Sequence, residues 1–295
     1  MREICIHGHF YQPTRVHPWT DRVEQQPSAG PFRDWNHRIA AESYAPNAAA
    51  RLLDEQGRTR TVRNTYASMN FDFGPTLLSW LGLERPVLLE GLRSADRDSI
   101  SRFGRGSAMA QPFHHPILPL CDDLDRETEV VWGLTYFSMV FGRPAEGMWL
   151  SETAIDTASL EVIAKHGVEY VIVAPHQVEA IELDSGEWRS VEGADVVNRA
   201  FRIDLPSGRS VAAVVYDGVV SQAVAFEGLL HSGDRLANRL SDASQATGFV
   251  LIATDGESYG HHHAYGEMAL AYAQEQIDAR SDCRLTNVAS WLERN

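Results

Sequence analysis

The chain has 295 residues and a formal net charge of −14, because 40 acidic side chains outnumber 26 basic ones. This negative charge disfavours nucleic acid and anionic membranes as partners, since both repel an acidic surface. Hydrophobic residues make up 44% of the chain, which is typical of a globular core and excludes wholesale disorder.

The cysteines indicate a reducing compartment. Cys5, Cys121 and Cys283 are odd in number and far apart, so we expect free thiols rather than a disulfide framework. The N-terminus shows no apolar signal segment, and no run approaches membrane-spanning length. We therefore expect a cytoplasmic protein.

The first predicted element is a buried strand over residues 3–10. Its alternation places Cys5, His7 and His9 on one face. Two histidines at the end of a first strand suggest contact with a substrate, with no metal between them. The alternative is a pair of core histidines hydrogen-bonded to backbone.

A long segment rich in proline and aromatic residues follows, from residue 11 to residue 46. Segments of this size tend to be functional lids or binding loops. Trp19 and Trp35 in this loop would contact substrate, or would simply pin the loop to the rest of the fold.

Strands and helices alternate through the rest of the chain, with an antiparallel excursion near 184–205. We expect helices at 48–53, 76–83, 87–103, 125–141 and 160–166 and from 264 onward, and parallel strands at 3–9, 61–69, 107–111, 147–151, 169–174, 210–216 and 248–254. Seven such units predict an α/β fold: a seven-stranded parallel (β/α) barrel forming one domain over 1–295, with a doubly wound open sheet as the alternative. The nucleotide-binding glycine motifs are absent, and we expect no cofactor.

Two carboxylates stand at the carboxyl ends of predicted strands. Glu152 ends the fourth strand and Asp255 ends the seventh, so both should face one cleft. Two carboxylates in one cleft are the minimal equipment for glycosidic bond chemistry. Alternatively, Glu152 only caps the following helix.

Trp149 precedes Glu152 by three residues. Alternation puts Trp149 on the face opposite Glu152, so we expect its ring to pack between strand and helix and not to touch substrate. The expected stacking surfaces are then Tyr11, Trp19, Trp35 and Tyr259.

Five segments together resemble glycoside hydrolase family 57, more closely a bacterial branch of it, and its N-terminal catalytic barrel in particular. They cover nearly the whole chain in the family's order: His7–Pro13, Asn70–Leu78, Gly106–Pro119, Gly147–Glu152 and Thr254–His261.

This resemblance implies a seven-stranded (β/α) barrel with retaining, metal-independent activity on α-glucans, as a hydrolase or transglycosylase of the amylase, glucanotransferase or branching type. Glu152 would be the nucleophile and Asp255 the general acid/base. The residues expected to bind the oligosaccharide or polysaccharide substrate are His7, His9, Gln12, Trp19, Trp35, His115, Glu257, Tyr259 and His261.

The resemblance also implies a C-terminal helical region that closes the cleft. The sequence ends about forty residues after the acid/base motif, so we expect that region to be absent. Either the sequence is that of a short or truncated member of the family, or the cleft is completed by a second copy or by a partner chain.

Two other classes compete with a glycosidase. The histidines His7, His9, His114 and His115 and the run 261–263 could suit the zinc of a polysaccharide deacetylase, although the Asp-Asp pair and His-xxx-His turn of those enzymes are missing. A non-catalytic carbohydrate-binding barrel is the other alternative. Metal analysis and an activity assay separate the three.

Overall fold

The computed structural model describes all residues from Met1 to Asn295. The strands are β1 (Arg2–Phe10), β2 (Val16–His17), β3 (Arg22–Val23), β4 (Ala50–Leu53), β5 (Thr59–Arg63), β6 (Asn70–Phe73), β7 (Ala108–Met109), β8 (Tyr170–Val173), β9 (Ala180–Glu182), β10 (Trp188–Ser190), β11 (Arg199–Asp204), β12 (Ser210–Val215), β13 (Phe249–Asp255) and β14 (Cys283–Leu285).

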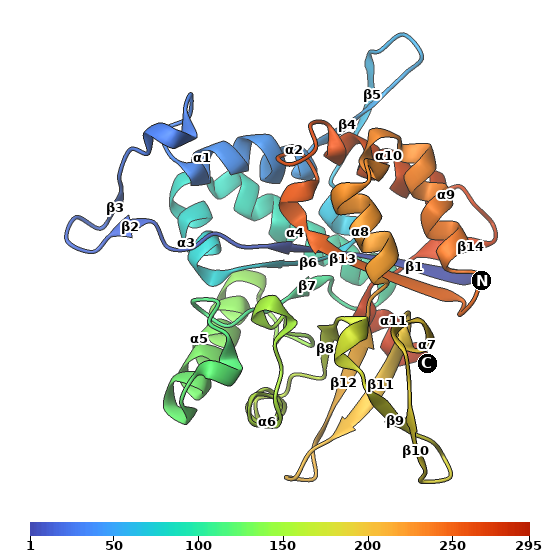
Figure 1. Cartoon of the computed structure of the whole chain (residues 1–295). Coiled ribbons are helices and arrows are strands. Elements are labelled where there is room, and N and C mark those ends of the chain that lie inside the picture. Colours follow the sequence, from blue (N-terminus) through green and yellow to red (C-terminus); the bar gives the residue numbers. More distant parts are fainter.

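The helices lie around these strands (Figure 1). They are α1 (Trp35–Ile39), α2 (Ala45–Ala48), α3 (Pro75–Glu84), α4 (Pro86–Phe103), α5 (Asp123–Phe141), α6 (Thr157–Lys165), α7 (Gly193–Val196), α8 (Gly218–Phe226), α9 (Gly233–Ala243), α10 (Gly266–Asp278) and α11 (Val288–Arg294), and a π-helical turn (Ala40–Tyr44) joins α1 to α2. None of them combines the length and the apolar run that crossing a bilayer requires.

Local sequence explains where the long helices begin and end. Helix α5 begins where Asp122 accepts a hydrogen bond from the backbone of Asp125, and it ends at Gly142 with φ 72°. Pro86 occupies the first position of α4, where its missing N–H is not needed, and Gly104 ends that helix with φ 90°.

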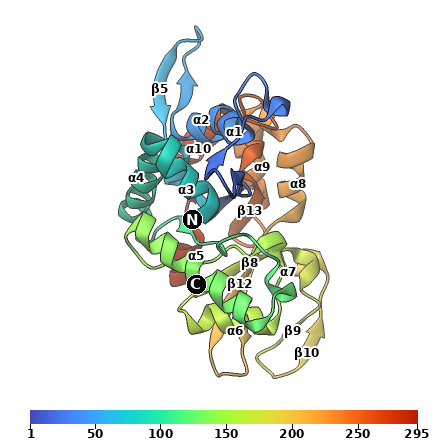
Figure 2. The same cartoon turned by 90° about the vertical axis from the view of Figure 1, so that its left-hand side faces the viewer.

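The central strands run parallel in the order β13-β1-β6-β7, with β14 also beside β1. Strands β8 and β12 form a second parallel pair, to which β11 adds an antiparallel edge. Isolated parallel bridges from Ala110 to Met148 and from Gly147 to Tyr170 join β7 to β8. Figure 2 shows α3, α4 and α5 on one side of this arrangement and α8 and α9 on the other.

No strand pairing joins β12 to β13, and the edge of β13 is satisfied in another way. The backbone N–H of Leu251 donates to Asn198 Oδ1 (3.0 Å), and its carbonyl accepts from the backbone of Asp217 (2.7 Å). The hydroxyl of Ser221, in α8, accepts from the backbone of Ala253 (3.1 Å). Asn198 just before β11, Asp217 just before α8 and Ser221 in α8 therefore form the hydrogen bonds that a neighbouring strand would form.

Two hydrophobic cores follow from strand alternation. The larger lies between strands and helices and includes Ile4, Ile6 and Leu150. The smaller lies on the opposite face, where alternate residues of the central strands meet one another and α11; it includes Cys5, Trp149 and Leu251. Each strand thus presents one face to the helices and the other to its fellow strands.

The predicted alternation of helices and strands about a parallel sheet is confirmed, and so is the antiparallel excursion, which forms the ladders β9–β10 and β11–β12. Two predictions of elements were wrong. The second parallel strand is β6, at 70–73, because residues 61–69 complete the hairpin of β4 and β5 and then form a 3-10 turn. Residues 48–53 leave α2 for β4 instead of forming a helix. Residues 147–150 pair with their parallel neighbours through isolated bridges and not through a continuous ladder.

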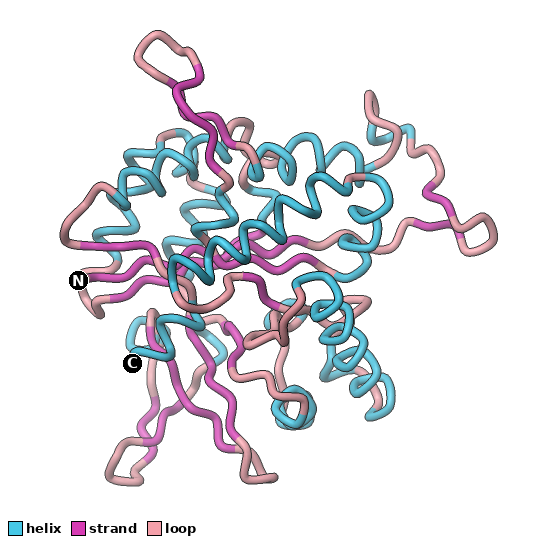
Figure 3. Tube along the Cα trace, turned by 180° about the vertical axis from the view of Figure 1, so that it is seen from behind, coloured by secondary structure: helices cyan, strands magenta, loops and turns pink.

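The segment 11–46 is more ordered than a loop. It contains the short β2–β3 hairpin and α1, and it runs through the π-helical turn into α2. The β2–β3 and β4–β5 hairpins both project from the body of the molecule in the view from behind (Figure 3). The amphipathic pattern of residues 35–48 was hidden by the prolines and aromatics around it.

Asn198 tests how the edge of β13 is held. The residue is 4% exposed and has φ 60°, and its amide satisfies the buried N–H of Leu251. We expect Asn198→Gly, which keeps the backbone conformation, to lower the free energy of unfolding by about 1–3 kcal/mol because that N–H loses its acceptor. Asn198→Ala should lose roughly 1 kcal/mol more through its positive φ. Equal stability of the Gly variant and the wild type in urea unfolding would contradict this role.

Candidate active site

Strand register places three polar residues in one row. His9 of β1 lies opposite Asp72 of β6 on one side and opposite Asp255 of β13 on the other. Paired residues of parallel neighbours point to the same face of a sheet. One row below, His7 lies between Asn70 and Ala253. Polar side chains from three strands therefore converge at the carboxyl end of the sheet.

Asp72 is the centre of a buried hydrogen-bond network. Its carboxylate lies 2.9 Å from His7 Nε2 and 2.8 Å from His9 Nδ1, and it accepts a hydrogen bond from the amide of Gln111. Burial alone would raise the pKa of Asp72, but His9 and His7 outweigh it and hold that pKa below its ordinary value. The carboxylate stays ionised in the interior because both imidazoles contact it.

The imidazoles of His9 and His115 face each other across the cleft. Their Nε2 atoms are 3.1 Å apart. Burial lowers the pKa of His9, but Asp72 more than compensates and leaves it raised. Burial, followed by the charge of His9, lowers the pKa of His115 to about 4. His115 is therefore the neutral acceptor, and His9 is the donor.

Trp149 lies against both histidines of β1. Its ring stacks on His7 at 4.8 Å and on His9 at 5.0 Å between centroids. The expectation that Trp149 packs between strand and helix was wrong: the side chain belongs to the smaller core, on the strand face opposite the helices, while Leu150 belongs to the larger core. Strand alternation does not say which face of this segment meets the helices, and the expectation chose the wrong face for Trp149.

Glu152 reaches the cleft through an unusual backbone conformation. Glu152 and Thr153 have φ values of 56° and 54°, in the left-handed region that costs about 1–3 kcal/mol per residue outside glycine. The amide of Gln177 donates to the carbonyl of Thr153 (2.7 Å) and fixes this turn. The turn, rather than strand alternation, exposes the carboxylate of Glu152.

Asp255 ends β13, Glu257 lies two residues beyond it, and the two carboxyl groups differ in environment. Asp255 is exposed at the end of the strand, whereas Glu257 is 8% exposed. The hydroxyl of Tyr44 donates to Glu257 Oε1 (2.5 Å). Burial outweighs this hydrogen bond and raises the pKa of Glu257 to about 7. A carboxyl group that keeps its proton near neutral pH thus lies two residues from one that is open to solvent.

These residues surround one cleft of about 330 Å³. Its lining comprises His9, Tyr11, Gln12, Ile39, His115, Glu152, Asp255, Glu257, His261 and His262. Tyr11 stacks on His115 at 4.1 Å, and His261 Nδ1 lies 2.5 Å from a carboxylate oxygen of Glu42. Seven of the eleven residues proposed from sequence therefore line the same cleft.

The other four lie elsewhere. His7 is fully buried beneath the cleft, where Asp72 and Trp149 contact it. Trp19 is 89% exposed near the β2–β3 hairpin and does not line the cleft. Trp35 meets His261 edge-on at 6.2 Å without lining the cleft.

Tyr259 is the fourth, and its expected stacking on substrate is excluded by burial. The side chain is fully buried in the larger core, and its hydroxyl accepts a hydrogen bond from Thr254 (3.2 Å). The ring that follows Asp255 by four residues is therefore part of the core and not of a binding surface. The 3-10 turn at Gly256–Ser258 instead directs it inward.

Sequence reasoning missed Asp72, Gln111 and Tyr44. Asp72 was part of the recognised segment 70–78, and a charged residue between Phe71 and Phe73 in an otherwise apolar strand is the signal that could have identified it. Tyr44 gave no such signal, because its contact with Glu257 depends on how the helical segment 35–48 folds over the cleft.

The arrangement does not fit a catalytic metal. No group of three or more His, Cys, Asp or Glu side chains is placed so that it could hold a metal ion. His7, His9 and Asp72 pair with one another, and the Nε2 atoms of His9 and His115 are at hydrogen-bond distance. We therefore derive no step through a metal.

Comparisons with known proteins identify the family to which this cleft corresponds. Residues 11–294 match the model of glycosyl hydrolase family 57. Alpha-amylase 1 of Dictyoglomus thermophilum is 33% identical over 106 residues, which are 36% of this chain and 15% of the amylase.

Two solved structures share the fold. The 4-alpha-glucanotransferase of Thermococcus litoralis superposes with a TM-score of 0.71 at 16% identity, over 100% of this chain and 40% of that one. The alpha-amylase AmyC of Thermotoga maritima gives 0.65 at 15% identity, over 100% and 75%. The matched part of this chain thus spans less than half the length of the Dictyoglomus thermophilum amylase and of the Thermococcus litoralis glucanotransferase.

Removing the Asp72 charge tests the network. In Asp72→Asn we expect the pKa of His9 to fall, because burial would then act without the carboxylate that opposes it. Imidazole resonances followed by NMR against pH measure this shift. Asp34→Asn, which removes the buried carboxylate beside His37, is the matched control and should leave His9 unchanged. An unaltered His9 titration in Asp72→Asn would exclude the network.

Glu257 makes stability depend on pH. Its folded pKa of about 7 lies above the ordinary 4.5, so the folded state holds the extra proton and loses stability as pH rises between these values. Glu257→Gln removes this loss. Relative to wild type, we expect the variant to gain about 3 kcal/mol of unfolding free energy between pH 4 and pH 8. Urea unfolding at both pH values measures the gain, and a constant difference would refute it.

Proposed function

We propose that this chain, which belongs to glycosyl hydrolase family 57, cleaves or transfers α-glucans with retention of the anomeric configuration. The observation that carries the proposal is that Glu152 and Asp255, from segments about a hundred residues apart, line one cleft. The names of its relatives, an alpha-amylase and a 4-alpha-glucanotransferase, support the substrate class. We also propose that the parallel strands form a seven-stranded (β/α) barrel, with residues 147–150 as its fourth strand.

The reaction proceeds in two displacements. A carboxylate oxygen of Glu152 attacks the anomeric carbon while the carboxyl of Asp255 gives its proton to the departing glycosidic oxygen. The product is a glycosyl ester on Glu152. The Asp255 carboxylate then removes a proton from water, or from a hydroxyl of a second glucan, as that oxygen displaces Glu152. Water gives hydrolysis, and a glucan hydroxyl gives transfer.

The surrounding groups serve these two steps. The left-handed turn fixes the backbone of Glu152, so its carboxylate enters the cleft from a defined position. Glu257, protonated near pH 7, can donate a hydrogen bond to a sugar hydroxyl in the cleft. Asp72 and His115 occupy both ring nitrogens of His9, so the pair offers a sugar hydroxyl the remaining nitrogen of His115, Nδ1, which donates when Nε2 of the neutral ring accepts from His9.

The two carboxylates are tested by isosteric substitution. We expect Glu152→Gln and Asp255→Asn each to lower kcat on maltooligosaccharides by about a thousandfold or more, because each removes one chemical step. Glu182→Gln, a conservative change on the peripheral strand β9, is the control. NMR of the freshly released sugar should show the α-anomer.

Two outcomes would contradict the proposal, and a third would add a second copy of the chain to it. Initial release of the β-anomer would exclude double displacement. Binding of glucan without turnover would favour a non-catalytic carbohydrate-binding protein. Activity that rises more than linearly with protein concentration would indicate that a second copy completes the cleft.

A further inference from the structure

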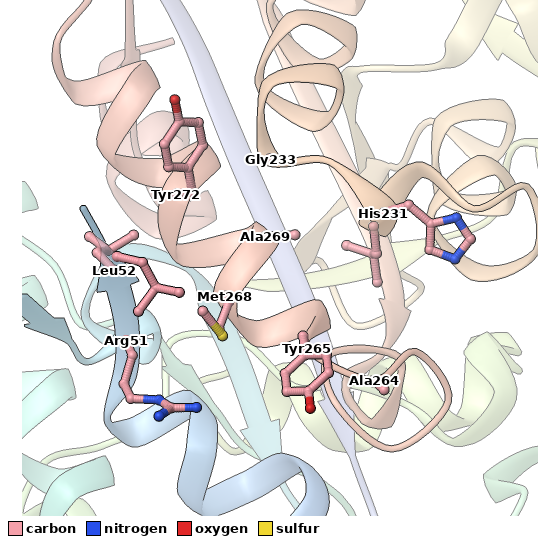
Figure 4. Close-up of a pocket in the computed structure, with 11 residues that line it drawn as sticks. Arg51, Leu52, His231, Gly233, Ala264, Tyr265, Met268, Ala269 and Tyr272 are labelled. Atoms are coloured by element: carbon pink, nitrogen blue, oxygen red, sulfur yellow. The ribbon is translucent and has the colours of Figure 1, made fainter. Parts of the chain in front are cut away.

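Glu257 is held from behind the cleft by side chains of the segment 11–46. A series of hydrogen bonds leads from Arg15 through Gln12 and Tyr44 to the carboxyl group of Glu257. The surface offers no comparable support: the groove of about 640 Å³ between β4 and α10 (Figure 4) is mostly apolar and shares no lining residue with the cleft. The buried series therefore determines how Glu257 faces the cleft.

Arg15 fixes the orientation of the Gln12 amide. Its Nη2 atom donates to Gln12 Oε1 (2.8 Å), and its Nε atom donates to Asn36 Oδ1 (3.1 Å). A guanidinium group carries only donors, so the atom of an amide that contacts it is the oxygen. Gln12 is 7% exposed and has little freedom to turn. The NH2 group of Gln12 therefore points away from Arg15.

Tyr44 lies between Gln12 and Glu257. Its side chain is fully buried, and its hydroxyl donates to Glu257 Oε1 (2.5 Å). Burial, followed by the charge of Glu257, raises the pKa of Tyr44 well above its ordinary value, whereas a hydrogen bond from Gln12 acts in the opposite direction. Only a donor lowers the pKa of a phenol, so the Gln12 NH2 group donates to the Tyr44 oxygen. The single proton of the hydroxyl is thus left for Glu257.

The direction of these hydrogen bonds determines which oxygen of Glu257 carries the proton. In a protonated carboxyl group the carbonyl oxygen is the stronger acceptor, so Oε1, which accepts from Tyr44, is that oxygen. Oε2 has no hydrogen-bond partner on another residue, and it is not one of the enclosed atoms that lack a partner. Since Glu257 lines the cleft, its O–H group is presented there on Oε2.

We propose that Arg15, Gln12 and Tyr44 are positioning residues, which direct the proton of Glu257 to Oε2 so that it donates to a hydroxyl oxygen of the sugar in the cleft. The identity of that ligand rests on the proposed function. Arg15 and Tyr44 do not line the cleft and act on it through Glu257. A sugar that accepts this proton binds the protonated form of Glu257 more tightly, so binding takes up protons just above the pKa of about 7.

The first test locates the proton without any ligand. At pH 5 the infrared band of the protonated Glu257 carbonyl is identified by its loss in Glu257→Gln. We expect this band to move to higher frequency in Tyr44→Phe and in Arg15→Met, because the carbonyl oxygen then loses its donor. Tyr66→Phe is the matched control: it removes a buried hydroxyl that donates to the Tyr44 carbonyl (3.2 Å), and it should leave the band in place.

The second test measures proton uptake when maltotetraose binds to the Glu152→Gln variant, which avoids turnover. Calorimetry at pH 7.5 in two buffers of different ionisation enthalpy should show uptake of about half a proton, and Glu257→Gln should abolish it. Arg15→Met should at least halve the uptake and raise Kd at pH 6 about threefold to tenfold, the range of one hydrogen bond. Arg15→Lys keeps a cationic donor and should stay within about twofold of wild type.

The outcomes distinguish failure of the positioning role from failure of the proposed function. A wild-type protein that takes up protons with maltotetraose but never cleaves it would overturn the proposed function and leave the positioning role standing. Release of protons, or no uptake, overturns donation to the sugar even in an active enzyme. An Arg15→Met variant with an unshifted band overturns the positioning role. So does an effect of Arg15→Met on Kd that is equally large in the Glu257→Gln background, because Arg15 would then act on the loop and not through Glu257.

Discussion

The arrangement of the cleft depends on a buried carboxylate that two imidazoles keep ionised. Asp72 has no exposed side-chain surface, and an unpaired charge at such a position would destabilise the fold by several kcal/mol. Only the observed register of β1 and β6 brings His7 and His9 to it together. A shift by one residue would turn both histidines to the helices. The same pairing that satisfies Asp72 therefore fixes the strand register and the direction of His9.

The local backbone of the cleft is strained, and the strain is held by contacts outside it. Three of the six non-glycine residues with positive φ, namely His115, Glu152 and Thr153, lie in or beside the cleft. Gln177 after β8 restrains Thr153, and Tyr11 packs against His115. Conformations of this kind persist where neighbouring structure enforces them. Two side chains are thus presented to the cleft in directions that a regular strand or helix would not allow.

Sequence was sufficient for features that depend on local pattern and insufficient for those that depend on packing. Asp255 could be placed because an uninterrupted apolar strand ends at it, and the register then brings it beside His9. The facing of Trp149 was missed because residues 147–150 touch their neighbours only through bridges, so alternation there gave two faces without saying which one is enclosed. Tyr259 was misjudged because the 3-10 turn at Gly256–Ser258 interrupts strand alternation and leaves the Tyr259 side chain in the larger core.

Contacts across long sequence separations account for the remaining residues. Tyr44 meets Glu257 only because a helical segment covers the end of β13, and no spacing in the sequence marks that approach. The same holds for Asn198, whose role at Leu251 follows from a gap between two strands. A residue whose role is to hydrogen-bond a buried N–H or carboxyl group can be recognised only when the position of that group in the fold is known.

The segment of chain that follows Asp255 is rigid, because buried groups hold its backbone. Between Asp255 and Tyr265 the carbonyl of Tyr259 accepts hydrogen bonds from Asn47 (2.7 Å) and Ser43 (3.1 Å), both buried. Gly260 has φ 128° and packs so closely on Glu42 that a Cβ would approach its carbonyl to 2.1 Å. A segment pinned in this way cannot move without breaking buried hydrogen bonds. The carboxylate of Asp255 therefore keeps its position beside His9, and Glu257 stays within hydrogen-bond distance of Tyr44.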